Sequence, residues 1–227
     1  MGYTRDWIVS QCEDAFEEIK TFYQKPFVNY RGKTEDTDEY YTEVIAEFLC
    51  NNISAYIGGI SVITRQYSYK TTGHDGKVHN PNSGRDEENI AKKMYGNQYS
   101  CVGEMIDYQT PLNSNDDDHA GKIDLLAYDG KTLRILELKK LDSDETMLRC
   151  VLEAFTYWKT VDRAKLLVDF GLPVNMPVKA CPFVFKTGKQ HDEMGEERPQ
   201  LRRLMGLLDS KPFYISKDND NYTVTED

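Results

Sequence analysis

The hydrophobic pattern near the N-terminus is helical. Over residues 4–24, apolar side chains recur at spacings of three and four, which places them on one helical face: Trp7, Ile8, Cys12, Phe16, Ile19 and Phe22. A second stretch, for which Asp36 or Thr37 is the expected cap, repeats the spacing in Tyr40, Val44, Ile45, Phe48 and Leu49. Acidic residues fill the opposite faces, as expected of surface exposed to water. Both stretches are predicted to be amphipathic helices.

The pattern changes between residues 61 and 84. The tyrosine-rich segment SVITRQYSY (61–69) is predicted to be extended, and KTTGHDGKVHNPNSG (70–84) is polar and carries the Gly, Pro and Asn residues of a linker or mobile loop. We therefore expect a boundary near residue 80. It separates an N-terminal helical region of unassigned function, residues 1–80, from a core of residues 81–227.

Shorter segments follow in the core. The first of them predict a helix at 86–96 that Gly96 ends, a strand at 101–112 and a loop at 113–121. Two strands within 121–140, joined at Asp129-Gly130, come next, followed by a helix at 143–158 capped by Asp144. The remaining segments predict a helix or strand at 162–170, a strand at 179–186, a helix at 201–208 and a strand at 212–216. The fold class is therefore α/β, with a mixed central sheet flanked by helices.

Composition narrows the class of protein. The 227 residues are 39% hydrophobic and 29% charged, as in an ordinary globular protein, and no apolar run approaches the ~18 residues of a membrane span. The net charge of −10 argues against a simple DNA-coating protein. The five cysteines have no metal-finger or redox spacing, and the N-terminus has no signal-peptide pattern. We expect a cytoplasmic protein with reduced, mostly buried thiols.

The hairpin within 121–140 gathers charged side chains. With Asp129 and Gly130 as a two-residue turn, Asp124 faces Ile135. Because side chains alternate along a strand, Glu137 and Lys139 share the face of Asp124. Two carboxylates on one face can hold a hard divalent cation such as Mg²⁺ or Mn²⁺, and the lysine can orient a water or stabilise developing negative charge. The open alternative is a strand end that carries ordinary solvent-exposed charges.

These residues resemble a known family. Ile123-Asp124, followed after twelve residues by Glu137-Leu138-Lys139, is similar to the motif of the PD-(D/E)xK nuclease superfamily, and the order of elements over residues 86–158 is similar to its order. The resemblance covers roughly residues 85–186 and implies a restriction-endonuclease-like αβββαβ core. Ile123 stands where the family name has proline, and the acidic NDDDH (115–119) is an unusual neighbour for a phosphate.

The resemblance also implies roles for named residues. Asp124, Glu137 and the backbone carbonyl of Leu138 would ligate Mg²⁺ or Mn²⁺, and Lys139 would complete the catalytic set. Glu87 or Glu88 would supply a carboxylate from the first core helix; Glu87 is favoured because it shares the inward face with Ile90 and Ala91, although a plain helix N-terminal acid is an equal alternative.

Further residues would bind the substrate. Arg149, Glu153 and Tyr157 are spaced by four and line one stripe of the next helix, and Glu153-x-x-x-Tyr157 lies where some members have Gln-x-x-x-Tyr. Tyr157 can equally be a core residue. Lys140 adds positive charge beside the motif.

The sequence therefore predicts a Mg²⁺- or Mn²⁺-dependent nuclease, with nucleic acid as partner and DNA favoured over RNA. The alternative is a non-catalytic binding or regulatory module of the same fold, whose protein partner would bind the acidic N-terminal helices. A third reading is an unrelated α/β enzyme in which the motif is accidental. Strandedness, cleavage mode and oligomeric state are left open.

Overall fold

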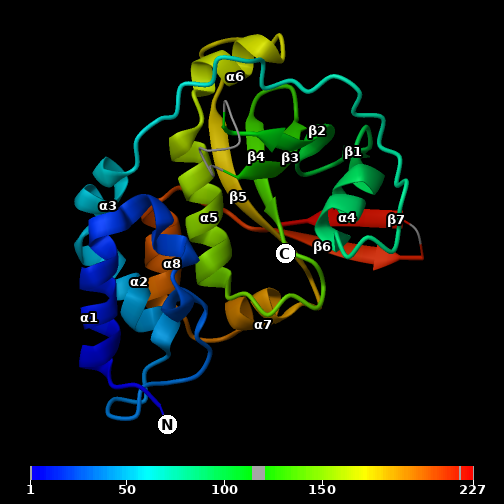
Figure 1. Ribbon diagram of the computed structural model, residues 1–227. Helices are drawn as coiled ribbons and strands as arrows, with labels where there is room; N and C mark the ends of the chain where they lie inside the picture. Colours follow the sequence, from blue (N-terminus) through cyan, green and yellow to red (C-terminus); the bar gives the residue numbers. More distant parts are fainter. Residues whose placement is uncertain (1, 114–120, 220, 227) are drawn as a thin grey trace.

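A computed structural model describes residues 2–113, 121–219 and 221–226 (Figure 1). The elements are α1 (Arg5–Ala15), η1 (Phe16–Gln24), η2 (Pro26–Asn29), α2 (Tyr41–Asn51), α3 (Ile53–Gly59), α4 (Asp86–Met94), β1 (Gln98–Tyr99), β2 (Gly103–Pro111), β3 (Lys122–Tyr128), β4 (Leu133–Leu138), α5 (Met147–Thr160), α6 (Arg163–Asp169), β5 (Val178–Phe185), α7 (Lys189–Gly195), α8 (Pro199–Leu207), β6 (Phe213–Asp218) and β7 (Asn221–Thr225).

The strands form one mixed sheet, in the order β1-β2-β3-β4-β5-β6-β7. Neighbours from β1 to β4 are antiparallel, β4–β5 and β5–β6 are parallel, and β6–β7 is antiparallel. Helix α5 makes the crossover that a parallel β4–β5 pair requires. The predicted α/β class, with a mixed sheet and flanking helices, is confirmed.

The two faces of the sheet are covered by different helices. Along β4, Leu133 and Ile135 belong to the hydrophobic cluster that contains α5, whereas Leu136 and Leu138 belong to the cluster that contains the buried residues of α4. This alternation follows from the two-residue period of a strand. A strand covered on both faces has few exposed positions, so charged residues on β3 and β4 must find partners inside the protein.

The N-terminal helices pack against α5 on the side away from the sheet (Figure 1). Their apolar residues belong to the same cluster as α5. The Asn29 side chain accepts a hydrogen bond from Thr146 N, 2.7 Å away, at the start of α5. Glu43 of α2 accepts hydrogen bonds from the backbone amides of Gln200 and Leu201 in α8. The boundary near residue 80 remains a prediction.

Two N-terminal predictions are corrected. The α-helix predicted for 4–24 ends at Ala15 and continues as 3₁₀ structure, because the backbone at Glu18 is non-helical (φ −128°, ψ 56°). The second helix begins at Tyr41, since the preceding residues form a turn in which Thr34 N donates to Glu39 O. The segment 61–69, which was predicted to be extended, contains no helix and makes one isolated bridge, from Ile63 to Val161.

Later elements follow the prediction more closely. Gly96, with φ of 74°, follows the end of α4 as expected, and the ambiguous segment 162–170 contains helix α6. The cap of α5 is Thr146 and not Asp144, because the Thr146 hydroxyl accepts from Arg149 N. Strand β7 was not predicted, and most of the loop 113–121 lies outside the described residues.

The five cysteines are free thiols, four of them buried and Cys101 half-buried, so the prediction of mostly buried thiols is confirmed. Among the described residues, no helix combines the length and the apolar character that crossing a membrane requires.

The cap of α5 is testable by a matched pair of threonines. The Thr146 hydroxyl is fully buried, accepts from Arg149 N at 3.2 Å and donates to Val28 O at 3.0 Å, whereas Thr4, which caps α1, is exposed and accepts from Trp7 N alone. We expect Thr146→Ala to lower the free energy of unfolding by about 2 kcal/mol and Thr4→Ala by about 1 kcal/mol or less. Urea unfolding of both variants measures this, and equal losses would contradict it.

Candidate active site

The β3–β4 hairpin places Asp124 and Glu137 across from each other. Tyr128 pairs with Leu133 and Leu125 with Leu136, so the same register, continued by one residue, sets Asp124 opposite Glu137. The turn comprises residues 129–132, where the Asp129 carboxylate accepts from the backbone amides of Lys131 and Thr132. The turn therefore has four residues and not the predicted two. The pairing shifts by two positions, so that Asp124 lies opposite Glu137 and not opposite Ile135. The shift is even, so the predicted shared face is preserved.

Both carboxylate oxygens of Asp124 accept hydrogen bonds. Leu138 N donates to Oδ2 at 3.0 Å, and Gln109 Nε2 of β2 donates to Oδ1 at 3.0 Å. Burial raises the pKa of Asp124 to about 7; the ammonium of Lys139 opposes the shift, and the charge of Glu87 adds to it. Near neutral pH this carboxyl is therefore close to its titration midpoint.

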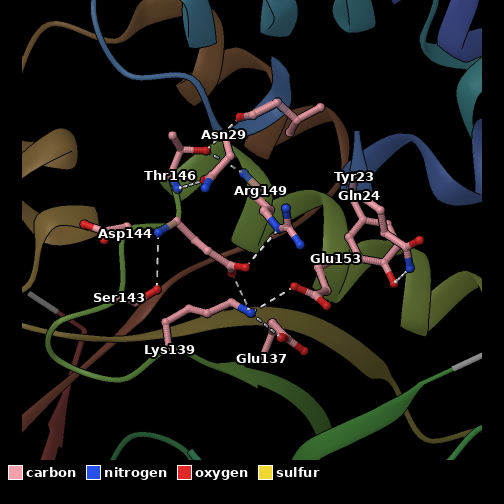
Figure 2. A network of polar contacts seen from close by, with 12 residues as sticks. Tyr23, Gln24, Asn29, Glu137, Lys139, Ser143, Asp144, Thr146, Arg149 and Glu153 are labelled. Carbon is pink, nitrogen blue, oxygen red and sulfur yellow. Dashed lines mark hydrogen bonds and ion pairs between the residues drawn. The ribbon is translucent and has the colours of Figure 1, made fainter. Parts of the chain in front are cut away.

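Lys139 is the centre of an ionic network (Figure 2). Its side chain is only 7% exposed, and its Nζ lies 2.8 Å from Glu137 Oε1, 2.9 Å from Glu153 Oε2 and 2.8 Å from Glu145 Oε2. Burial lowers the pKa of Lys139, but the carboxylates of Glu137 and Glu153 outweigh burial and hold the pKa well above its ordinary value. The lysine is a fixed positive charge.

One carboxylate oxygen of Glu137 accepts a hydrogen bond, and the other has no partner among the described residues. The residue is 3% exposed, Oε1 accepts from Lys139, and the buried Oε2 has no hydrogen-bond partner among the described residues. Burial, reinforced by the charge of Asp124, raises the pKa of Glu137 well above its ordinary value. A buried oxygen without a partner is costly, so its presence here calls for a ligand or a function.

Helix α5 faces this hairpin with the predicted stripe of residues. Glu153 reaches Lys139, and Tyr157 OH donates to Glu153 Oε1 at 3.0 Å. Arg149 Nε lies 3.0 Å from Glu145 Oε1, so Arg149 joins the network through Glu145. The ring of Tyr23, from the N-terminal region, lies 6.1 Å from the ring of Tyr157.

Helix α4 contributes Glu87 and not Glu88. Glu87 Oε1 accepts from Lys140 N at 3.1 Å, whereas Glu88 pairs with Lys92 and Arg85 on the helix surface. Burial raises the pKa of Glu87. A groove of about 510 Å³ opens at this point; its lining residues are Gly84, Arg85, Asp86, Glu87, Glu88, Gln109, Lys122, Asp124 and Lys140.

The structure thus gathers Asp124, Glu137, Lys139, Glu87 and Glu153 in one place. The side chain of Lys140 lines the groove but does not join this cluster, and its Nζ lies 3.4 Å from Asp86 and from Asp142. The acidic stretch 115–119 lies outside the described residues.

Three site residues were missed by the sequence analysis. Gln109 lies at a strand position with a positive φ of 49°, which alternation does not anticipate. Glu145 precedes its helix, outside the periodic stripe. Tyr23 comes from a segment more than a hundred residues away in the chain. Of the three, only Glu145 could have been found from the sequence, because it is an acidic residue just before the helix that faces the strand leading to Lys139.

The donors present fit a divalent cation. Glu137 Oε2 has no hydrogen-bond partner among the described residues, and Asp124 lies opposite. The carboxylates of Asp124, Glu137, Glu87, Glu145 and Glu153 outnumber the cations Lys139 and Arg149. Within the described ranges, no three His, Cys, Asp or Glu side chains already converge as a metal cage. Mg²⁺ does not need one, since it is usually held by one or two carboxylates together with waters and substrate oxygens.

Comparisons with family models, with curated proteins and with solved structures each found no match.

The raised pKa of Asp124 predicts a pH effect on stability. Its pKa is about 7 in the folded protein against an ordinary 3.8, so the folded state binds this proton more tightly than the unfolded state does. The resulting stabilisation is complete below about pH 4 and is lost as the pH rises toward 7. Without divalent cations, wild type should therefore lose at least about 1 kcal/mol more than Asp124→Asn between pH 5 and pH 8. Urea unfolding at both pH values measures the difference; identical pH dependence would contradict the assignment.

Proposed function

We propose that this protein is a metal-dependent nuclease that hydrolyses phosphodiester bonds, with DNA favoured as the substrate. The observation that carries the proposal is the unpartnered, buried Oε2 of Glu137, on the same sheet face as Asp124 and beside the buried ammonium of Lys139. A hairpin built only for stability would have no use for this combination, because each buried charge costs several kcal/mol before it is paired.

Asp124 and Glu137 would hold Mg²⁺ or Mn²⁺, with the backbone carbonyl of Leu138 as a third donor. When bound, such an ion lowers the pKa of a coordinated water and stabilises charge on the phosphate oxygens. Hydrogen bonds from Leu138 N and Gln109 Nε2 fix the orientation of the Asp124 carboxylate, which suits it to this role. Orientation of a ligand by a second layer of hydrogen bonds is typical of metal sites.

Lys139 would stabilise the negative charge that develops on the phosphate or orient the attacking water. Glu153 and Glu145 hold the ammonium in place, and Tyr157 in turn holds Glu153. A charge fixed before the reaction does not have to be reorganised during it, which is the basis of electrostatic catalysis. Glu153 and Tyr157 are therefore positioning residues for Lys139, and Arg149 balances the charge of Glu145.

The substrate backbone would enter through the groove at Asp124 and Glu87. Arg85, Lys122 and Lys140 line this groove and supply positive charge at its surface. The order α4, β2, β3, β4, α5, β5 is the order implied by the resemblance to the PD-(D/E)xK superfamily, so we also propose a restriction-endonuclease-like core. A protein partner for the N-terminal helices remains a prediction.

Metal binding is expected to stabilise the protein. At a tenfold excess of Mn²⁺ over its Kd, the gain is about 1.4 kcal/mol, which raises the Tm by roughly 3–6 °C in a chain of this size. Glu137→Gln should abolish the shift, because the amide removes the anionic ligand. Glu104→Gln, an exposed residue of β2, is the matched control and should keep it. A wild-type Tm that does not respond to Mg²⁺ or Mn²⁺ would contradict the site.

Lys139 is expected to act on turnover. Lys139→Gln keeps a hydrogen-bond donor for the carboxylates but removes the charge, so kcat for cleavage of DNA with Mg²⁺ should fall by roughly 10²-fold or more. Lys140→Gln should raise KM and reduce the dependence of KM on salt concentration, since the variant loses one phosphate contact among several. Lys131→Gln, in the exposed hairpin turn, is the control and should match wild type.

Thermal unfolding must first show that Lys139→Gln is folded. Equal losses of kcat in the Lys139 and Lys140 variants would mean that the lysines only attract phosphate, and the mechanism would be wrong. Absence of metal-dependent cleavage from wild type, with DNA and RNA in single- and double-stranded form, would overturn the proposed function.

A further inference from the structure

A second pocket, of about 450 Å³, adjoins the groove of the candidate active site. Asp86 and Lys140 line both. The other lining residues come from the segment before α4, from α4, from the loop after β4 and from the ends of β5, β6 and β7. The volume lies within the range of about 300–1,000 Å³ that is usual for small-molecule pockets.

The walls of this pocket combine flat apolar surface with hydrogen-bonding groups. Ile90, Phe185 and Tyr222 supply aliphatic and aromatic surface. Asn89 and Ser216, both half-buried, supply an amide and a hydroxyl on different sides of the pocket. Nucleobases are recognised by this combination, in which apolar side chains contact the flat faces and polar groups contact the edges.

The rim adds two further features. Leu141, which directly follows Lys140, is 49% exposed, an unusual position for a large apolar side chain next to a polar groove. Three lysines and two aspartates line the pocket, so its charge balance is positive in a protein whose net charge is −10: Lys93, Lys140, Lys217, Asp86 and Asp142. Apolar surface inside and positive charge at the rim suit a base that carries a phosphate.

We propose that this pocket binds an unpaired nucleobase next to the phosphate held in the groove. The inference rests on the proposed nuclease function and deepens it, because a base inside the pocket cannot stack or pair within a duplex. The substrate class is therefore nucleic acid that is single-stranded at the cleavage point, or from which one nucleotide is extruded.

Binding of mononucleotides tests the pocket without any cleavage. Calorimetry with Mn²⁺ should show that the common deoxynucleoside 5′-monophosphates bind wild type at least tenfold more tightly than deoxyribose 5-phosphate, which lacks the base. Leu141→Glu should weaken mononucleotide binding at least tenfold, by loss of apolar contact and by repulsion of the phosphate. Leu207→Glu, at a leucine of α8 that is 46% exposed and does not line the pocket, is the matched control and should stay within twofold of wild type.

A second variant separates the base from its phosphate. Ile90→Trp fills the pocket without changing charge, and it should reduce mononucleotide binding to the level of deoxyribose 5-phosphate. In a Glu137→Gln background, a single-stranded oligonucleotide should bind at least tenfold more tightly than the matched duplex, and Ile90→Trp should remove the difference. Equal binding of mononucleotide and deoxyribose 5-phosphate, or unchanged binding in both pocket variants, would overturn the proposal.

The outcomes also separate this proposal from the nuclease function. Base-dependent binding that Leu141→Glu and Ile90→Trp abolish, in a protein with no metal-dependent cleavage, would support the nucleotide site and overturn the nuclease. The opposite result is cleavage by wild type that Glu137→Gln abolishes, together with mononucleotide binding that neither Leu141→Glu nor Ile90→Trp changes. It would support the nuclease function and overturn the nucleobase pocket.

Discussion

The ionic contacts of Lys139 constrain the arrangement of the whole central region. Its ammonium lies within 2.9 Å of carboxylate oxygens from Glu137 on β4, Glu153 on α5 and Glu145 in the intervening loop. Charges removed from water cost several kcal/mol each, and only close contacts recover that cost. The crossover helix therefore has little freedom to slide along the sheet, because a shift of one turn would leave Lys139 and Glu153 buried without each other.

The N-terminal region contributes to the same constraint from the outer side of α5. Arg31 donates to the backbone carbonyls of Asp144 and Glu145, 3.2 and 2.6 Å away, and Asn29 accepts from Thr146 N. These contacts fix the loop that delivers Glu145 to Lys139. The helices before residue 60 thus act on the candidate active site through backbone position, whether or not they also bind a partner. One of their aromatic residues, Tyr23, contacts Tyr157 of the stripe on α5 edge to face.

Much of the site could be predicted from the sequence because its geometry depends on parity. Asp124, Glu137 and Lys139 share a face for any even-length turn, so the error in turn length moved the pairing by two residues and left the face intact. The helix stripe was predictable for a similar reason, since a spacing of four fixes a face. Gln109 and Tyr23 depend on a bent strand and on a contact far along the chain, which periodicity does not encode.

The charge distribution bears on how a protein with a net charge of −10 would bind the proposed polyanionic substrate. At physiological ionic strength the Debye length is about 8 Å, so acidic residues on distant surfaces contribute little to the potential at the groove. The potential at the groove is set by the near charges: three cations, Arg85, Lys122 and Lys140, and four carboxylates, Asp86, Glu87, Glu88 and Asp124. Those carboxylates repel phosphate while they are unligated. In the proposed nuclease, a divalent cation would offset them and give the groove a net positive charge, so metal binding and substrate binding would favour each other.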